Sequence, residues 1–391
     1  MKIVDVSAFY SPFGGGVKTY VERKLAIAPQ LGHDMSIIVP SDSNRVEAFG
    51  ERARIIHLKS PQLVVDRRYR YFESAGPVHE LLDRASPDFV EASSPWRTAN
   101  IVADWPGTAG RALIMHADPL STYAYRWFGA ITSRDVIDRQ FEFFWRHLRR
   151  AAGKYDLTIV ANASLAERLA AGGVARVVTE PMGIDAGVFS PNLRDMDLRR
   201  DLLARCSLPE CATLMLGVGR HSAEKRWPMI IEACEMAARN SQVGLIIVGD
   251  GRHRRLLAKA IGGNPHIQLL SPITDRTLLA RVYASADVLL HGCETETFGL
   301  VAAEAAASGL PLIVPDEGGA SGMVSQGAGA TFRAGNARDA ATKISAFLSG
   351  DRQRAAERAC ETAHKIPTLD QHFERLFSRY DRLLLNDAKA A

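Results

Sequence analysis

The sequence predicts an α/β protein with two consecutive doubly wound domains. Its 391 residues are enough for two domains of ordinary size. Short apolar runs alternate with amphipathic stretches through the first half, and the same alternation restarts near residue 213. Strands separated by helical segments are typical of βαβ units and of mostly parallel sheets.

The first half carries the pattern of one such domain. Apolar runs of strand length lie at residues 3–6, 35–39, 54–58, 89–92, 112–116, 157–161 and 176–178. Helical spacing is found between most of these runs, for example at 17–31 and 164–171. We therefore expect residues 1–187 to form the first domain.

The second half repeats the pattern. Strand-like runs lie at 213–219, 245–248, 267–270, 287–291 and 311–314. Helical stretches lie at 227–240, 253–260, 275–285 and 298–308. We expect residues 188–368 to form the second domain, after a charge-rich linker at 185–208. Because ligands of open α/β sheets bind at the carboxyl ends of the strands, a cleft between the two domains is the expected site.

The last segment predicts a long terminal helix at 369–385. Its apolar residues follow helical spacing: Phe373, Leu376, Phe377, Tyr380, Leu383 and Leu384. A helix with such a face needs a surface to pack on.

Composition excludes several classes of protein. Hydrophobic residues make up 47% and charged residues 24%, as in a globular protein. A net charge of +4 is too small to argue for a nucleic-acid partner. The five cysteines are odd in number and form no Cys-x-x-Cys pair or zinc spacing. We find no signal peptide and no apolar run of spanning length, and therefore expect a cytoplasmic protein.

A glycine run follows the first strand directly. Gly14, Gly15 and Gly16 precede a helix, where backbone N–H groups are able to approach a phosphate closely. The third glycine of a dinucleotide fingerprint is missing. A plain tight turn is the competing interpretation.

Two cations follow the first strand of the second domain. Arg220 and Lys225 lie in the segment GRHSAEK, on a loop that enters a helix. Such a pair suits a diphosphate. A solvated charged loop is the alternative.

A pair of glutamates marks the helix expected at 298–308. Glu296 precedes the helix, and Glu304 lies about two turns into it, just before three alanines that indicate tight packing. A buried acid is costly without a partner, and ribose or sugar hydroxyls are suitable partners. Simple helix capping is the competing interpretation for Glu296.

Several motifs together resemble the family-4 retaining glycosyltransferases. They occur in the expected order: GGGVKTYVE, HADP, GRHSAEKRW, VGDG and ETFGLVAAEAAASGLPLIVPDEGG. The resemblance covers nearly the whole chain. It implies the GT-B fold, two Rossmann-like domains facing a central cleft, with the terminal helix at 369–391 packed back on the first domain.

The resemblance also implies roles for the residues around the diphosphate. The amides of Gly15 and Gly16 would meet the diphosphate of the donor. Arg220 and Lys225 would neutralise it as it leaves. These cations take the place of a bridging metal ion, so the resemblance implies no metal and no cofactor besides the nucleotide-sugar substrate.

Further roles concern the sugar and the ribose. Glu304 would hold the ribose hydroxyls, and Glu296 would hold the transferred sugar together with three amides. These amides belong to Phe298, Gly299 and Leu300. His116, in HADP at a strand end, matches the family histidine beside the reacting centre. His291 departs from the pattern, since proline is frequent there.

The implied reaction is the transfer of a hexose from a UDP- or GDP-linked donor to a hydroxyl acceptor, with retention of anomeric configuration. A nucleotide-sugar epimerase of the same fold, a dinucleotide-dependent oxidoreductase and a catalytically silent sugar-binding protein are alternatives. The missing glycine and the lack of an acid at the expected place argue against the oxidoreductase.

Basic and aromatic residues gather after HADP. The aromatic residues are Tyr123, Tyr125, Trp127, Phe128, Phe141, Phe143, Phe144 and Trp145. The basic residues are Arg139, Arg146, Arg149, Arg150 and Lys154. One interpretation is peripheral contact with the inner face of a membrane and a lipid or lipid-linked acceptor. An ordinary core helix with a basic solvated side is the other.

Overall fold

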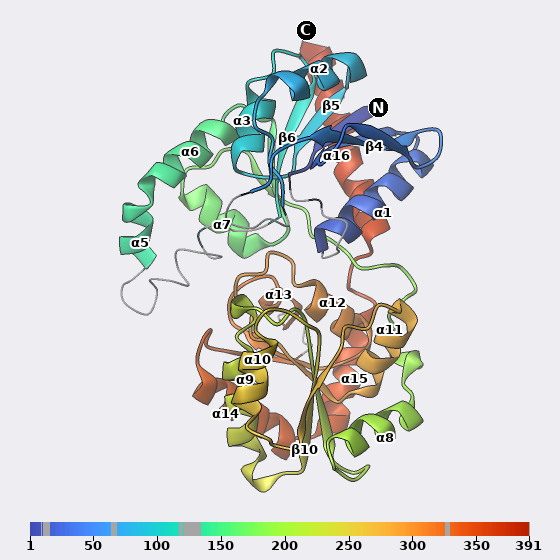
Figure 1. The fold of residues 1–391 in the computed structure, drawn as a ribbon, viewed down its shortest axis with the longest axis vertical. Coiled ribbons are helices and arrows are strands. Elements are labelled where there is room, and N and C mark those ends of the chain that lie inside the picture. The colour runs from blue at the N-terminus through green and yellow to red at the C-terminus, as the bar shows by residue number, and fades with distance from the viewer. Residues whose placement is uncertain are drawn as a thin grey trace. The chain divides into compact units, whose positions relative to one another are not determined.

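The computed structural model divides the chain into two compact units. The first comprises Met1–Met182 and Leu369–Ala391, and the second comprises Gly183–Thr368. Within the chain, the structure describes residues 1–8, 10, 16–63, 69–116, 120, 134–324 and 329–390. Each unit is described by itself (Figure 1).

The first unit is built on an eight-stranded sheet in the order β3-β4-β2-β1-β5-β6-β7-β8. Its strands are β1 (Lys2–Val6), β2 (Asp34–Ser41), β3 (Arg45–Ala48), β4 (Ala53–Lys59), β5 (Phe89–Ala92), β6 (Gly110–Met115), β7 (Leu157–Val160) and β8 (Val177–Thr179). All pairings are parallel except that of β3 with β4. The strand order reverses between β1 and β5, which makes this point the expected ligand edge of the sheet.

Helices cover both faces of this sheet. They are α1 (Gly16–Gln30), α2 (Gly76–Ala85), α3 (Arg97–Ala103), α5 (Arg134–Gln140), α6 (Glu142–Ala152), α7 (Ala163–Ala171) and α16 (Leu369–Ala390). Successive strand residues point to opposite faces, so Val4 and Val6 pack with α2, α3, α6 and α7, whereas Ile3 packs with α1 and α16.

The terminal helix α16 completes the core of the first unit. Phe373, Leu376, Phe377 and Tyr380 are buried in one cluster with α1 and the strands. The Tyr380 ring stacks on Phe89 at a centroid distance of 3.9 Å. Figure 1 shows α16 beside α1, in the first unit. The helix therefore has the packing surface that its apolar face requires.

A fully buried charge cluster lies where the first sheet reverses order. Asp5 and Glu91 are side-by-side partners on β1 and β5, and neither is exposed. The Lys24 ammonium of α1 lies between them, 2.9 Å from Asp5 Oδ2 and hydrogen-bonded to Glu91. Burial raises the pKa of Glu91 to about 7, although Lys24 lowers it. Tyr380 donates to Glu91 Oε1 at 2.8 Å, so α16 takes part in the same network.

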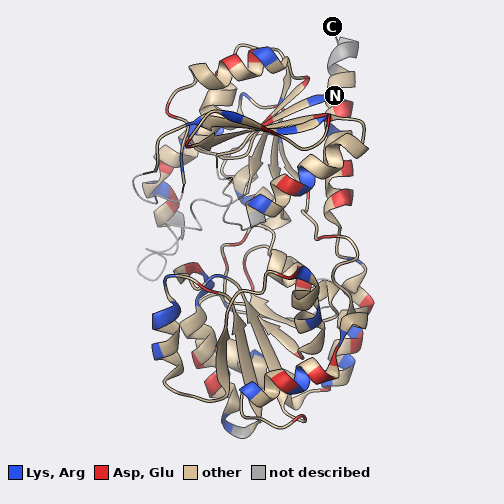
Figure 2. Ribbon diagram, turned by 45° about the vertical axis from the view of Figure 1, so that its right-hand side comes forward, with Lys and Arg blue, Asp and Glu red and all other residues tan. Residues whose placement is uncertain are grey.

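The second unit has a six-stranded parallel sheet in the order β11-β10-β9-β12-β13-β14. Its strands are β9 (Thr213–Val218), β10 (Val243–Val248), β11 (Ile267–Leu270), β12 (Val288–Leu290), β13 (Leu312–Pro315) and β14 (Gly329–Phe332). None of these strands contains a charged residue, as Figure 2 shows. Such apolar strands are typical of a sheet covered by helices on both faces.

Helices form a layer on each face of this second sheet (Figure 1). One layer contains α9 (Trp227–Ala237), α10 (Arg254–Ile261) and α14 (Ala337–Ser349). The other contains α8 (Met196–Arg205), α11 (Arg276–Ser285), α12 (Leu300–Ala307) and α15 (Arg352–Ala363). The short helix α13 (Ser321–Val324) follows β13. The prediction of two Rossmann-like units is confirmed.

Several sequence boundaries need correction. The segment 185–208, interpreted as a linker, contains helix α8. Asp195 caps this helix, and the buried Arg199 side chain anchors it to the second unit. Arg199 lies 2.9 Å from Asp287 and donates to Ala212 O at 2.8 Å. The unit boundary lies at Met182, ahead of the predicted residue 187. Strands β3 and β14 and helices α14 and α15 were not predicted.

Among the described residues, no helix combines the length and apolar character needed to cross a bilayer.

The buried ammonium of Lys24 yields a stability prediction. Lys24→Met removes the counter-charge from two buried carboxylates, so we expect a loss of about 3–5 kcal/mol of unfolding free energy. Arg23→Met is the matched control on the same helix, because Arg23 pairs with Asp370 at a half-exposed position and should cost at most about 1 kcal/mol. Urea denaturation of the full chain measures both, and equal losses would contradict the prediction.

Candidate functional site

The strand order of the second sheet brings two predicted motifs together. The order reverses between β9 and β12, so the loops after these strands leave from neighbouring carboxyl ends. The β9 loop carries Arg220 and Lys225, and the β12 loop carries Glu296. The topology therefore places the two loops side by side.

An ion pair joins these loops. Lys225 Nζ is hydrogen-bonded to Glu296 Oε1, and the two side chains are only 11% and 21% exposed. On the other side of the carboxylate, His291 Nε2 lies 3.3 Å from Glu296 Oε2. The predicted cation and the predicted sugar-binding acid are thus held in direct contact.

Neighbouring charges determine the ionisation states of Glu296 and His291. Burial alone would raise the pKa of Glu296, but Lys225 and His291 outweigh it and hold that pKa well below its usual range. Burial lowers the pKa of His291, but Glu296 outweighs this effect and raises it to about 9. Glu296 is therefore a carboxylate at neutral pH, with cations on both sides.

Arg220 lies in the same loop but has a different environment. Its side chain is 65% exposed, and its guanidinium lies 3.6 Å from Glu224 Oε1. The backbone of Arg220 is held, since its carbonyl accepts from Trp227 Nε1 at 2.9 Å. The Lys225 side chain is thus held in place by an ion pair. The Arg220 side chain lies at the surface, and only its backbone is held in place.

The amides predicted to hold the sugar lie at the start of α12. This helix begins at Leu300, two residues later than predicted at Phe298, because Gly299 at its N-cap has a φ of +81°. In the described part of the chain, no backbone acceptor takes the amides of Phe298, Gly299 and Leu300. The first N–H groups of a helix lack internal partners and are suited to bind oxygens.

Two glycines, one in the loop after β13 and one at the N-cap of α12, allow that loop to pack against this helix start. Gly319 donates its amide to Glu296 O at 2.6 Å. A Cβ on Gly319 would lie 2.4 Å from the carbonyl carbon of Phe298, and a Cβ on Gly299 would lie 2.9 Å from the Ala320 amide. The two loops approach too closely for a side chain at these positions.

The second predicted glutamate has protein partners. Glu304 is 7% exposed, and its Oε1 lies 2.9 Å from Arg276 Nη1. Its Oε2 accepts from the Tyr283 hydroxyl at 3.1 Å. Arg276 also contacts Asp185 Oδ2 at 3.0 Å. Arg276 and Tyr283 thus partner the buried acid within the protein. Each carboxylate oxygen keeps a further lone pair, so the contact of Glu304 with ribose hydroxyls stays a prediction.

Sequence reasoning missed Arg276 and Tyr283. They lie seven residues apart on α11, hence on one face of the helix. This spacing was the available signal, but it also fits an ordinary amphipathic helix.

The remaining predicted residues belong to the first unit. His116 follows β6, and its ring meets the Tyr20 ring of α1 edge-on at 4.9 Å. Burial lowers the pKa of His116 to about 4, so the imidazole is neutral at neutral pH. Gly16 begins α1, whereas Gly15 lies outside the described residues. Figure 1 shows α1 and β6 in the same unit.

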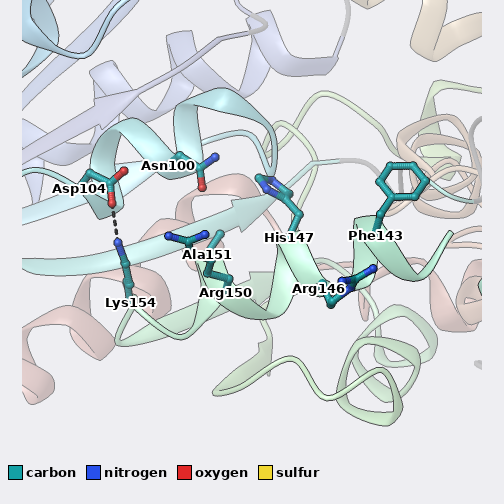
Figure 3. Close-up of a pocket in the computed structure, with 8 residues that line it drawn as sticks. All are labelled: Asn100, Asp104, Phe143, Arg146, His147, Arg150, Ala151 and Lys154. Atoms are coloured by element: carbon teal, nitrogen blue, oxygen red, sulfur yellow. Dashed lines mark hydrogen bonds and ion pairs between the residues drawn. The ribbon is translucent and has the colours of Figure 1, made fainter.

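The first unit also has a basic groove between α3 and α6 (Figure 3). Its volume is about 690 Å³. The groove is lined by Asn100, Asp104, Phe143, Arg146, His147, Arg150, Ala151 and Lys154. Phe144, Trp145 and Leu148 on the opposite side of α6 are buried in the core. The helix thus has an apolar inner side and a basic outer side.

Two arginines of this groove differ from its lysine. Within the described residues, Arg146 and Arg150 make no hydrogen bond or ion pair, whereas Lys154 pairs with Asp104. Phe143 is 63% exposed beside them. The predicted aromatic cluster at Tyr123, Tyr125, Trp127 and Phe128 lies outside the described residues.

Comparison with known proteins identifies the family. The family "Glycosyl transferase 4-like domain" matches residues 15–183, and "Glycosyl transferases group 1" matches residues 204–364. A GDP-mannose-dependent alpha-mannosyltransferase of Mycobacterium tuberculosis is 34% identical over 323 residues, which cover 82% of this chain and 80% of that protein. The chain belongs to this glycosyltransferase family.

Other relatives agree in fold and reaction class. A GDP-mannose-dependent alpha-(1-6)-phosphatidylinositol dimannoside mannosyltransferase of the same organism is 29% identical, over 80% of this chain and 79% of that protein. Sucrose-phosphate synthase from Thermosynechococcus elongatus superposes with a TM-score of 0.78 at 18% identity, over 99% of this chain and 100% of that one. The predictions of a GT-B fold and of glycosyl transfer from a nucleotide sugar are confirmed, and the relatives give no support to the epimerase or the oxidoreductase.

The close approach of the two glycine loops is testable. We expect Gly319→Ala to destabilise the protein by about 1–3 kcal/mol, because the new methyl group meets backbone atoms of Phe298. Gly322→Ala is the control, since a Cβ there meets no atom within 4 Å. Urea denaturation compares the two, and a Gly319 variant as stable as the control would refute this packing.

Proposed function

We propose that this glycosyltransferase moves a hexose from a nucleoside diphosphate donor with retention and without a metal ion. GDP-mannose is the first donor to examine, because several relatives are named as GDP-mannose-dependent. The observation that carries the proposal is the Lys225–Glu296 pair beside three available amides at the start of α12.

In the proposed reaction, the bond between the anomeric carbon and the β-phosphate oxygen breaks, and negative charge grows on the diphosphate. The Lys225 ammonium is already oriented by Glu296, so it stabilises this charge without reorganising. Arg220 adds a second, more exposed cation. The α12 amides bind oxygens of the donor, and the positive end of the helix favours them.

Retention follows if the acceptor hydroxyl attacks from the face that the diphosphate leaves. The acceptor oxygen bonds to the anomeric carbon, and its proton passes to the departing phosphate oxygen. No carboxylate nucleophile is then needed, unlike in retaining glycosidases. The anomeric configuration of the product, read by NMR, and the rate in excess EDTA test retention and metal independence.

Replacing either cation tests the assigned site. We expect Lys225→Ala and Arg220→Ala each to lower kcat by about 10²–10³, as is typical when a preorganised charge donor is lost. Lys259→Ala, at an exposed position on α10, is the control and should keep its rate. Nucleoside diphosphate release is measured with GDP-mannose and UDP-glucose, with and without acceptor. Unchanged turnover in both variants would refute the site.

We also propose that the acceptor is lipid-linked and that the protein works peripherally at the cytoplasmic face of a membrane. The support is the basic groove of the first unit, where Arg146 and Arg150 lack partners within the described residues and Phe143 is exposed. Anionic headgroups complement such a surface. A relative is named for a phosphatidylinositol dimannoside acceptor.

Charge reversal in the groove tests membrane contact. We expect Arg146→Glu with Arg150→Glu to weaken sedimentation with vesicles containing anionic lipid by at least about tenfold, at about 1 kcal/mol per basic residue. Arg354→Glu with Arg358→Glu is the control, because these exposed arginines have the same spacing on α15. Binding that ignores anionic lipid content would overturn the proposal.

A further inference from the structure

Three different metal-ligating side chains meet in the loop after β12. His291, Cys293 and Glu296 each offer one ligand atom, and these atoms all lie within 4.8 Å of one another. His291 is fully buried and Cys293 is 1% exposed, whereas Glu296 is 21% exposed at its side chain. The cluster is thus shielded from solvent at His291 and Cys293 and accessible to solvent at Glu296.

The imidazole of His291 is poorly satisfied by the protein. Among the described residues, neither ring nitrogen makes a well-directed hydrogen bond, and the Nε2 contact with Glu296 is an ion pair at 3.3 Å. Buried ring nitrogens are normally hydrogen-bonded. A fully buried imidazole that has an ion pair but no well-directed hydrogen bond, and that lies beside a thiol, points to a ligand.

The loop that carries these groups is held on several sides. The His291 amide donates to Ile313 O at 3.1 Å, and Glu294 accepts from Arg226 Nε at 2.8 and 2.9 Å. A Cβ on Gly292 would lie 2.8 Å from Lys225 O. The ligand atoms therefore start from fixed backbone positions, which lowers the cost of binding an ion.

The donor set selects the metal. A thiolate, an imidazole and a carboxylate together suit Zn²⁺, whereas Mg²⁺ and Ca²⁺ prefer oxygen ligands alone. Metal–ligand bonds of about 2.0–2.3 Å place the ligand atoms of a tetrahedral site roughly 3.5 Å apart. Side-chain rotations that move each ligand atom by about 1 Å would bring the three groups to this spacing. Three protein ligands leave the fourth position to water.

Lys225 does not occupy the same place as the ion. It binds Glu296 Oε1, whereas His291 faces Oε2. An ion on the Oε2 side adds two positive charges near the ammonium. Two protons released on binding offset this: the Cys293 thiol becomes a thiolate ligand, and the His291 imidazolium becomes a neutral imidazole ligand.

We propose that His291, Cys293 and Glu296 form a Zn²⁺ site that inhibits the enzyme by withdrawing Glu296 from the donor sugar. The inhibition rests on the proposed role of Glu296, whereas the binding of the ion does not. The ion is an inhibitor and takes no part in the reaction.

Direct binding is tested without any assay of activity. EDTA removes bound metal from the full chain, and the EDTA is then removed. The apoprotein is titrated with Zn²⁺ by calorimetry and with Co²⁺ by absorption spectroscopy. We expect one tight Zn²⁺ ion per chain and a thiolate-to-cobalt charge-transfer band. Cys293→Ser should abolish the band and weaken Zn²⁺ binding at least about tenfold, because even the loss of an outer-shell partner costs that much.

Matched variants exclude the two exposed thiols of the unit. Cys211→Ser and Cys360→Ser change exposed cysteines and should leave the titration unchanged. Loss of binding in these controls, or unchanged binding in Cys293→Ser, would overturn the site. Thermal denaturation of each apoprotein verifies that it is folded.

Inhibition is tested separately. We expect Zn²⁺ to slow release of nucleoside diphosphate by the wild type, EDTA to restore it, and Cys293→Ser to resist Zn²⁺ while keeping its basal rate. Tight binding with no inhibition would overturn the inhibitory role and leave the site standing. A protein that binds Zn²⁺ but shows no transfer with any donor would instead count against the proposed function.

Discussion

The pairing of Lys225 with Glu296 is the interaction on which the second unit's functional face depends. Either charge alone would be costly at its depth, and together they fasten the loop after β9 to the loop after β12. The strand reversal of the sheet makes their meeting possible, because there two neighbouring strands send their following helices to opposite faces. Gly319 and Gly299 then allow a third loop to close against the second. The charge that we propose for stabilising the leaving diphosphate thus also links two loops of the fold.

Much of the fold could be predicted from the sequence because most strands and helices leave a local pattern in it. Buried parallel strands are nearly continuous apolar runs, so most strands were placed within a residue or two. Strand β3 is fully exposed and β14 reads GATF, so neither carries that signal. Helix α8 was mistaken for a linker because its charges dominate the pattern, and the salt bridge of Arg199 with Asp287 is a long-range contact.

The candidate site was likewise predictable only in part. Motifs identified Lys225, Glu296 and Glu304 individually, but not which of them touch. Arg276 and Tyr283 satisfy Glu304 from a helix whose sequence carries no motif. The cysteine spacing did not single out Cys293, because its proximity to His291 and Glu296 depends on how the loop after β12 turns. The Lys24 cluster was missed for a related reason, since the register of β1 with β5 decides that Asp5 and Glu91 are neighbours.

The return of α16 to the first unit has a consequence for synthesis on the ribosome. Phe373, Phe377 and Tyr380 belong to the same core as strands near the amino terminus. The nascent first unit therefore emerges with one sheet face covered by α1 but not by α16, and stays so until the whole second unit has been translated. The second unit, whose residues are contiguous, has all its own sequence first. Exposed hydrophobic surface of this kind favours aggregation and chaperone binding, and a premature stop codon ahead of α16 would damage the half of the protein that was made first.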